Sequence, residues 1–293
     1  MVQVQGKGCK RCGSTARSGM TPRCLRRGVL LVLISALYRE SGALAQQART
    51  PSLEDLAKAA QNPIADTISV GLETIVMPNT GPYRQTANVV KIEPVIPFQL
   101  NADWNLVTRT TIPGIAQVRF SAEQGRIGGV GDVNQILALT PSHSGPLIWG
   151  VGPTFSYPSA TDPALGSGKW SAGPTLVALT MPGPWVLGVL ANNIWSFAGP
   201  SDRAPVNQMM LQYFVTYNFS DGSYISASPV ITANWLAKGR DRWVIPIGAG
   251  VGKMFMVDQQ PINAEIGVYY NLLKPDHASH WQFRASLAFL FPK

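Results

Sequence analysis

The chain has 293 residues, of which 45% are hydrophobic and 14% are charged, whereas an ordinary soluble domain has about 25% charged residues. Its formal charge of +8 would suit an anionic partner, but eight of the 24 Lys and Arg residues lie in residues 1–45, where Glu40 is the one acid. The rest of the chain is almost neutral, which argues against a nucleic-acid partner.

Residues 1–45 have the three parts of a secretory signal peptide. A basic region precedes ten apolar residues, 29–38, and the small-x-small site at 43–45 predicts cleavage before Gln46. Ten apolar residues are too few for a transmembrane helix, which needs about 20. Residues 1–19 look superfluous, so Met20 is an alternative start. The basic region contains Arg23, Arg26 and Arg27.

All three cysteines lie in this leader, at Cys9, Cys12 and Cys24. The Cys9-x-x-Cys12 pair lacks a second pair and a nearby histidine, so a zinc or redox site is not favoured. Cleavage would leave a chain without cysteine, which suits an oxidising compartment. After Gln46 no run of 18 apolar residues occurs, so a helical membrane protein is excluded and a closed barrel remains.

The segment 46–66 is predicted to contain one short helix, from Ser52 to Gln61. Ser52 can cap it, two acids occupy its first turn, and Asn62-Pro63 ends it. Its apolar residues fall on one face, so we expect the helix to pack against other residues. Both a plug in the barrel and a periplasmic clip are open.

From Thr67 the hydrophobic pattern has a period of two, which is typical of strands with one apolar face. About twelve such runs follow, and each has at least the 9–11 residues that a tilted transmembrane strand needs. We therefore predict an all-β fold, a transmembrane antiparallel up-and-down barrel over 67–293. The runs are 67–77, 87–99, 103–112, 130–140, 146–157, 169–180, 185–197, 207–219, 223–235, 242–255, 261–272 and 280–291.

The connections between these runs alternate between long and short, as expected for a barrel with long outer loops and tight periplasmic turns. All eight tryptophans lie near a strand end and on the apolar face, which predicts two aromatic girdles at the membrane boundaries. A soluble sandwich core is the alternative. The tryptophans are Trp104, Trp149, Trp170, Trp185, Trp195, Trp235, Trp243 and Trp281.

Four stretches resemble a proteobacterial outer-membrane barrel family whose members are labelled transporters and often neuromedin U. They are LAKAAQNPIAD (56–66), KWSAGP (169–174), MPGPW (181–185) and NNIWSF (192–197). GVGD (129–132) adds a similarity to the outer-membrane proteins of the meta-pathway of phenol degradation. This resemblance implies a barrel that admits small, aromatic molecules, and it brings no catalytic residue.

The histidines suggest little chemistry. His277 and His280 share the last outer loop with Asp276, but a solvated loop explains them better than a metal site. A hydrolase would need a serine tied to His280, and no motif provides one. The glycine-rich stretch 125–131 is not followed by a helix pattern, so it is interpreted as a loop and not as a phosphate site. No enzyme activity, cofactor or metal is expected.

The inward-facing charges are the candidate site. If the aromatic face meets lipid, three acids and three bases point into the lumen, either as a bracing salt-bridge network or as a constriction that selects permeants. They are Glu73, Lys91, Glu93, Arg109, Glu265 and Arg284. Phe214 and Tyr269 are the inward rings expected to touch an aromatic permeant.

The sequence thus predicts an exported outer-membrane transporter or channel for passive passage of small, aromatic or hydrophobic solutes. The alternative is a closed, non-conducting barrel with a binding or envelope-structural role. Expected partners are outer-membrane lipid, a small-molecule permeant and, during assembly, the barrel-insertion machinery, which would recognise Phe289 and Phe291.

Overall fold

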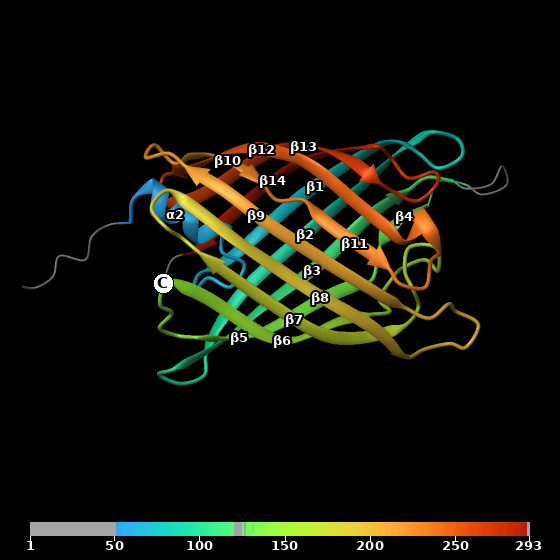
Figure 1. Ribbon diagram of the computed structural model, residues 1–293, viewed down its shortest axis with the longest axis horizontal. Coiled ribbons are helices and arrows are strands. Elements are labelled where there is room, and N and C mark those ends of the chain that lie inside the picture. Colours follow the sequence, from blue (N-terminus) through green and yellow to red (C-terminus); the bar gives the residue numbers. More distant parts are fainter. Residues whose placement is uncertain (1–50, 120–124, 126, 292–293) are drawn as a thin grey trace, which may run out of the picture. The chain divides into compact units, whose positions relative to one another are not determined.

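The computed structural model describes residues 51–119, 125 and 127–291. The predicted signal peptide 1–45, with its three cysteines and its cleavage site, lies outside the described residues. The described part forms a closed antiparallel barrel of 12 spanning strands, as predicted, with one short α-helix, α2 (Leu53–Gln61) (Figure 1).

The wall contains fourteen strand segments, because two of the spanning strands are interrupted. One is split at Gly131-Asp132 and the other at Ser228-Pro229. The segments are β1 (Ile68–Thr80), β2 (Gln85–Gln99), β3 (Trp104–Gln117), β4 (Ile127–Val130), β5 (Val133–Pro141), β6 (Leu147–Tyr157), β7 (Trp170–Thr180), β8 (Trp185–Ala198), β9 (Asn207–Asn218), β10 (Ser223–Ala227), β11 (Val230–Asn234), β12 (Trp243–Val257), β13 (Gln260–Leu273) and β14 (Trp281–Phe291).

Each spanning strand pairs with the spanning strands before and after it in the sequence, and β1 pairs with β14 to close the barrel. The closing register sets Ile68 opposite Phe291 and Val76 opposite Phe283. Because side chains alternate between the two faces of a strand, one face of each lines the lumen and the other forms the outer wall. A closed wall leaves no strand edge unpaired.

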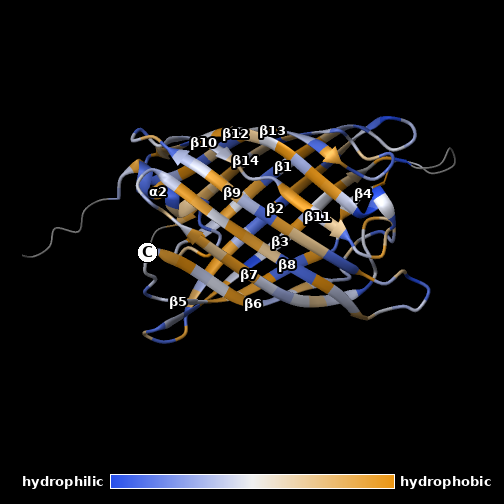
Figure 2. Cartoon of the chain, viewed as in Figure 1, coloured by the Kyte–Doolittle hydropathy of each residue, from blue (hydrophilic) through white to orange (hydrophobic). Residues whose placement is uncertain are grey.

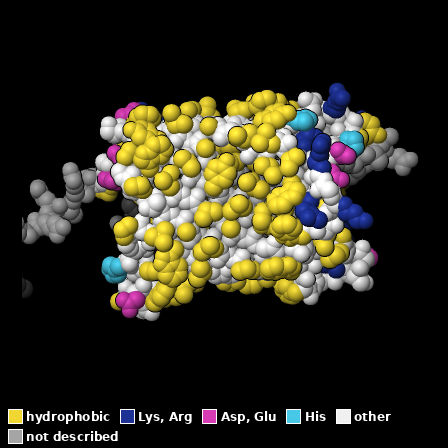
Figure 3. All heavy atoms as spheres, in the orientation of Figure 1, with side chains coloured by type: hydrophobic (Ala, Val, Ile, Leu, Met, Phe, Trp, Pro, Cys, Tyr) yellow, Lys and Arg dark blue, Asp and Glu magenta, His cyan; other side chains and the backbone are white. Residues whose placement is uncertain are grey.

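The outer wall is apolar. Large hydrophobic side chains are widely exposed on it, among them Ile266 at 64% and Leu272 at 60%. Figure 2 shows hydrophobic and hydrophilic residues interspersed along the strands. In Figure 3, hydrophobic side chains cover the visible face of the wall, while charged side chains gather at the two ends. An apolar surface this large marks a membrane or partner contact and is unfavourable in water.

Helix α2 lies at one end of the barrel, which we call the helix end (Figure 1). Ser52 and Asp55 form a capping box at its start, as the sequence predicted for Ser52. Its apolar face packs on the inside of the barrel, where Ala57 is fully buried with Tyr224 and Met254. No helix in the described part of the chain is long and apolar enough to cross a bilayer.

Among the connections that the structure describes in full, the longer ones lie at the opposite end, the loop end: 158–169, 199–206, 235–242 and 274–280. The connection 235–242 contains a 3-10 turn, η1 (Gly239–Arg242). At the helix end the connections are 100–103, 142–146, 181–184, 219–222 and 258–259.

The first connection at the loop end, 81–84, departs from the predicted alternation. It is as short as 100–103, because β1 and β2 continue their pairing to Thr80 and Gln85. Strand β3 also runs five residues beyond the predicted end at residue 112. Cross-strand pairing with β2 carries the strand through Pro113 and Gly114.

Candidate functional site

Four of the predicted lumen charges form two ion pairs between adjacent strands. The Lys91 ammonium lies 2.6 Å from Glu73 Oε2, and Arg109 Nη2 lies 2.9 Å from Glu93 Oε2. The Thr111 hydroxyl donates a second contact to Glu93, to Oε1 at 3.0 Å. These side chains occupy inward positions of β1, β2 and β3, and the register between β1 and β2 sets Glu73 opposite Lys91.

The other two predicted charges, Glu265 and Arg284, make no ion pair with any described residue. Glu265 accepts hydrogen bonds from Tyr224 Oη at 3.1 Å and from Ser226 Oγ at 2.7 Å. Arg284 donates to the Ser228 carbonyl at 3.2 Å and to Gln282 Oε1 at 3.0 Å. Its guanidinium also lies 4.3 Å from the centre of the Tyr269 ring, a cation–π contact.

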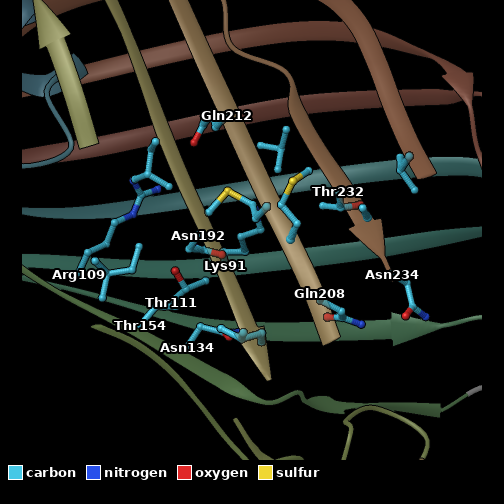
Figure 4. Close-up of a pocket in the computed structure, with 18 of the residues that line it drawn as sticks. Lys91, Arg109, Thr111, Asn134, Thr154, Asn192, Gln208, Gln212, Thr232 and Asn234 are labelled. Atoms are coloured by element: carbon cyan, nitrogen blue, oxygen red, sulfur yellow. The ribbon is translucent and has the colours of Figure 1, made fainter. Parts of the chain in front are cut away.

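A cavity of about 480 Å³ occupies the lumen toward the loop end, and we call it the loop-end chamber. Figure 4 shows polar side chains converging on it from several strands, among them Lys91, Asn134, Asn192, Gln208 and Asn234. Asp241 and Arg242 from η1, with Pro275, also line it. A small polar or aromatic molecule can be accommodated in a space of this size.

A second cavity of about 210 Å³ lies toward the helix end and is called the helix-end chamber. Part of its lining comes from the last two residues of α2, Ala60 and Gln61, and from Pro63, which follows the helix. Glu73, Glu265, Asn263 and Ser286 line it from the strands. Gln61 exchanges two hydrogen bonds with Asn218, which fixes the end of the helix against β9.

Three residues line both chambers: Glu93, Arg109 and Gln212. The chambers therefore meet at the Arg109–Glu93 ion pair. The shared lining thus places one charged pair at the junction of the two cavities.

The opposite side of the lumen is filled with aliphatic side chains. Ile64, which follows α2, is 5% exposed and packs with Val107, Val177, Leu179 and Leu190 in one buried cluster. The N-terminal segment is thus anchored inside the barrel by burial of its apolar side chains. Of the two arrangements the sequence left open, the segment inserts into the barrel and does not clip onto its outside.

The two predicted aromatic permeant contacts differ in position. Phe214 lines the helix-end chamber and packs on Gly188, where a Cβ would lie 2.4 Å from the ring. Tyr269 is 1% exposed and is covered by Arg284, so its ring is not accessible from the lumen in this conformation.

All eight tryptophans lie near strand ends, and several pair edge to face with another aromatic ring. Trp104 and Trp149 pair at the helix end with ring centres 6.0 Å apart, and Trp235 and Trp243 pair at the loop end at 5.5 Å. The Trp235 indole N–H donates to Asn193 at 2.7 Å. An apolar ring with a polar contact at its edge suits a boundary between lipid and water.

The histidines form no site. His280 stacks on Tyr270 with ring centres 5.6 Å apart, and in the described part of the chain no serine hydrogen-bonds to its ring. Residues 51–119, 125 and 127–291 contain no group of three His, Cys, Asp or Glu side chains that could hold a metal. In the glycine-rich stretch, residues 127–130 form β4.

Sequence reasoning missed Tyr224 and Asn263, which hold Glu265 in place. Asn263 Nδ2 donates to Tyr224 Oη at 2.8 Å, and a Cβ at Gly252 would lie 2.2 Å from Tyr224 Cζ, so the ring requires glycine beneath it. The sequence alone could show that Tyr224 and Gly252 both occupy inward positions in the alternation of their strands. Without the register of β10 and β12, the two could not be matched.

No family model and no curated protein sequence matches this chain. An outer-membrane channel from Pseudomonas putida F1 is similar in structure, with a TM-score of 0.59 at 14% identity over 77% of this chain and 96% of that chain. At this identity the likeness shows the fold alone.

Two further solved structures match with lower scores. The toluene transporter TodX from Pseudomonas putida has a TM-score of 0.42 at 9% identity, over 83% of this chain and 92% of that one. Outer membrane phospholipase A from Escherichia coli has a TM-score of 0.41 at 13% sequence identity, over 83% of this chain and 99% of that chain. Scores this low carry no argument about this chain.

Proposed function

We propose that this protein is an outer-membrane channel for the passive passage of small, aromatic or hydrophobic solutes. An apolar outer wall with aromatic rings near both ends is what a barrel in lipid requires. The helix end would face the periplasm and the loop end the outside, as the longer loops suggest. The structurally similar Pseudomonas putida protein is itself an outer-membrane channel.

The observation that carries this proposal is the pair of chambers that share Glu93, Arg109 and Gln212. In this proposal a solute passes from one chamber to the other at this shared, charged junction. The constriction would then lie at this junction, beside the ion pair of Lys91 with Glu73. Because the two ion pairs are balanced in charge, we expect weak preference between anions and cations.

Passage to the helix end requires the N-terminal segment to move, since Ala60, Gln61 and Pro63 line the helix-end chamber. The anchors that would have to release are Ile64 in the aliphatic cluster and Lys58, which donates to the Gly183 carbonyl at 2.6 Å. Opening events of this kind are expected on timescales of microseconds or longer.

The first test is gel mobility of unboiled and boiled protein from the outer-membrane fraction. A fast-migrating unboiled band is expected, and a soluble periplasmic protein without a shift would refute the membrane assignment. Planar-bilayer recordings then compare the full protein with a variant that lacks residues 46–66. We expect larger conductance without the segment, and no conductance or solute flux in either form would refute the channel.

The second candidate is a closed, non-conducting barrel with a binding or envelope-structural role. It is favoured by one observation, the burial of Ala57 and Ile64 inside the barrel, which seals the helix end. Recordings of the variant that lacks residues 46–66 separate the two candidates. A channel should gain conductance in this variant, and a further change at Arg109 should alter that conductance. A purely structural barrel should show no such conductance. As a check against a hydrolase, His280→Ala should leave lipid and ester turnover unchanged.

The remaining assignments belong to this proposal. Residues 1–45 would be removed as a signal peptide, and the barrel-insertion machinery would recognise the end of β14 at Phe289 and Phe291. Membership of the transporter family labelled neuromedin U, and the link to the meta-pathway of phenol degradation, rest on the sequence motifs given above.

A further inference from the structure

We propose that the helix-end chamber is a binding site for small primary amines, with Glu265 as the counter-charge of the ammonium group. This inference deepens the proposed function by naming a class of solute, and it rests on solutes reaching the lumen. The site lies between the floor at Gln61 and the charged junction at Arg109.

Among the acids that line the helix-end chamber, Glu265 is the one that forms no ion pair with a described residue. Of the three acids that line it, Glu73 is paired with Lys91 and Glu93 with Arg109. Within the described part of the chain, no Lys or Arg forms an ion pair with Glu265. A carboxylate away from bulk water is costly unless it is paired, so a cation at this position would be stabilised.

In the loop-end chamber, by contrast, basic side chains outnumber acidic ones. Lys91, Arg109 and Arg242 line it, against Glu93 and Asp241. A positively charged solute is therefore disfavoured there relative to the helix-end chamber. The charge difference directs an ammonium group toward Glu265.

Hydrogen bonding around Glu265 supports the same ligand. Tyr224 and Ser226 hold the carboxylate in one orientation. Asn263 lines the chamber and is 8% exposed, and its Oδ1 has no hydrogen-bond partner. Ser286, opposite Glu265 in the register with β14, adds a hydroxyl. An ammonium group has three donors and no acceptor, so an acid and neutral oxygens are suitable partners.

An organic cation fits better than a metal ion. The described residues contain no cluster of three His, Cys, Asp or Glu side chains suited to a metal. The rest of the chamber offers apolar surface from Phe214, Ala60 and Ala288, which suits a hydrocarbon group. At about 210 Å³ the chamber is smaller than the roughly 300–1,000 Å³ of a typical drug-sized site, so one ring or a short chain is the limit.

The test is titration calorimetry of the full protein, folded in detergent at pH 7, with benzylamine and with its neutral counterpart benzyl alcohol. We expect benzylamine to bind at least about tenfold more tightly, which corresponds to about 1.4 kcal/mol. Glu265→Gln should remove this preference. Asp258→Asn, which makes the same charge change in the exposed turn before β13, should retain it.

Two measurements keep the test decisive if Glu265→Gln does not fold, as judged by heat-modifiability. The preference of the wild-type protein for benzylamine needs no variant. Ser286→Lys would place a covalent ammonium beside Glu265 and should abolish benzylamine binding. Equal binding of the two probes, no binding of benzylamine, or full binding by folded Glu265→Gln would each overturn the inference.

The outcomes also separate this inference from the proposed function. Benzylamine binding without conductance or flux would overturn the channel and leave the amine site. Flux of neutral aromatic solutes without benzylamine binding would overturn the amine site and leave the channel.

Discussion

The lumen is bounded by two walls that are stabilised differently. The polar wall consists of the inward charges of β1, β2, β3, β13 and β14, whose groups are held by ion pairs and hydrogen bonds. The apolar wall consists of the inward residues of β5, β7, β8 and β9, where Ala138, Val177, Leu179, Val186, Leu190 and Phe214 pack with Ile64. The apolar wall anchors the N-terminal segment, whereas the polar wall contributes the charged pair where the two chambers meet.

The difference shows how one barrel can hold an N-terminal segment in its lumen and still contain cavities lined by charged groups. Burial of aliphatic side chains is non-directional and tolerates changes of shape. An ion pair is specific, and removal of one partner leaves an unpaired charge. The two walls should therefore respond differently to substitution, in stability and in passage.

The largest effect is expected from Arg109→Met in the polar wall. It leaves Glu93 without its partner at 2.9 Å, and we expect the free energy of unfolding to fall by about 4 kcal/mol. Guanidinium unfolding of the folded barrel in vesicles measures this. The double variant Glu93→Gln/Arg109→Met should recover most of the loss, and a double variant as unstable as the single one would contradict the explanation.

The same two variants sharpen the functional comparison. Because Arg109 lines both chambers, both variants should change single-channel conductance or solute flux. Unchanged passage in a folded double variant would mean that the junction does not control it.

A smaller effect is expected from Leu179→Ala in the apolar wall. Leu179 is 1% exposed, so truncation should lower the free energy of unfolding by about 3 kcal/mol through lost burial and a cavity. It does not belong to the lining of either chamber, so conductance should remain close to that of the wild type. A large change in conductance at unchanged stability would show that the two walls are not separate in function.

The smallest effect is expected outside the lumen, at Asp221 in the exposed turn 219–222. Hydrogen bonds from the Ser223 hydroxyl and backbone N–H, with Lys253 3.1 Å away, lower the pKa of Asp221 to about 2. Because the pKa is lower in the folded state, this contribution to stability is complete above about pH 4 and is lost as the pH falls toward 2.

Unfolding midpoints of wild type and Asp221→Asn from pH 7 to pH 2 test this contribution. The difference should be small, constant at neutral pH and absent near pH 2. A difference that persists at pH 2 would show that the carboxylate charge is not its cause. Since the group is fully exposed, neither lumen wall should be affected.

The sequence determined the architecture of this protein through a single property, the period of two in hydrophobicity. Alternation assigns every strand residue to the lumen or to the outer wall, so the twelve strands and the inward placement of Glu73, Lys91, Glu93 and Arg109 could be predicted. The capped helix at 52–61 followed from its local residues.

Only the tertiary structure decided which inward residues meet. Alternation gives the face of a residue but not its height in the barrel, which depends on the register between strands. Register paired Glu93 with Arg109 and left Glu265 to Tyr224 and Ser226. It also covered Tyr269 with Arg284. The insertion of Ile64 among residues far away in sequence depends on closure of the barrel, because the space that it fills exists only once the wall is complete.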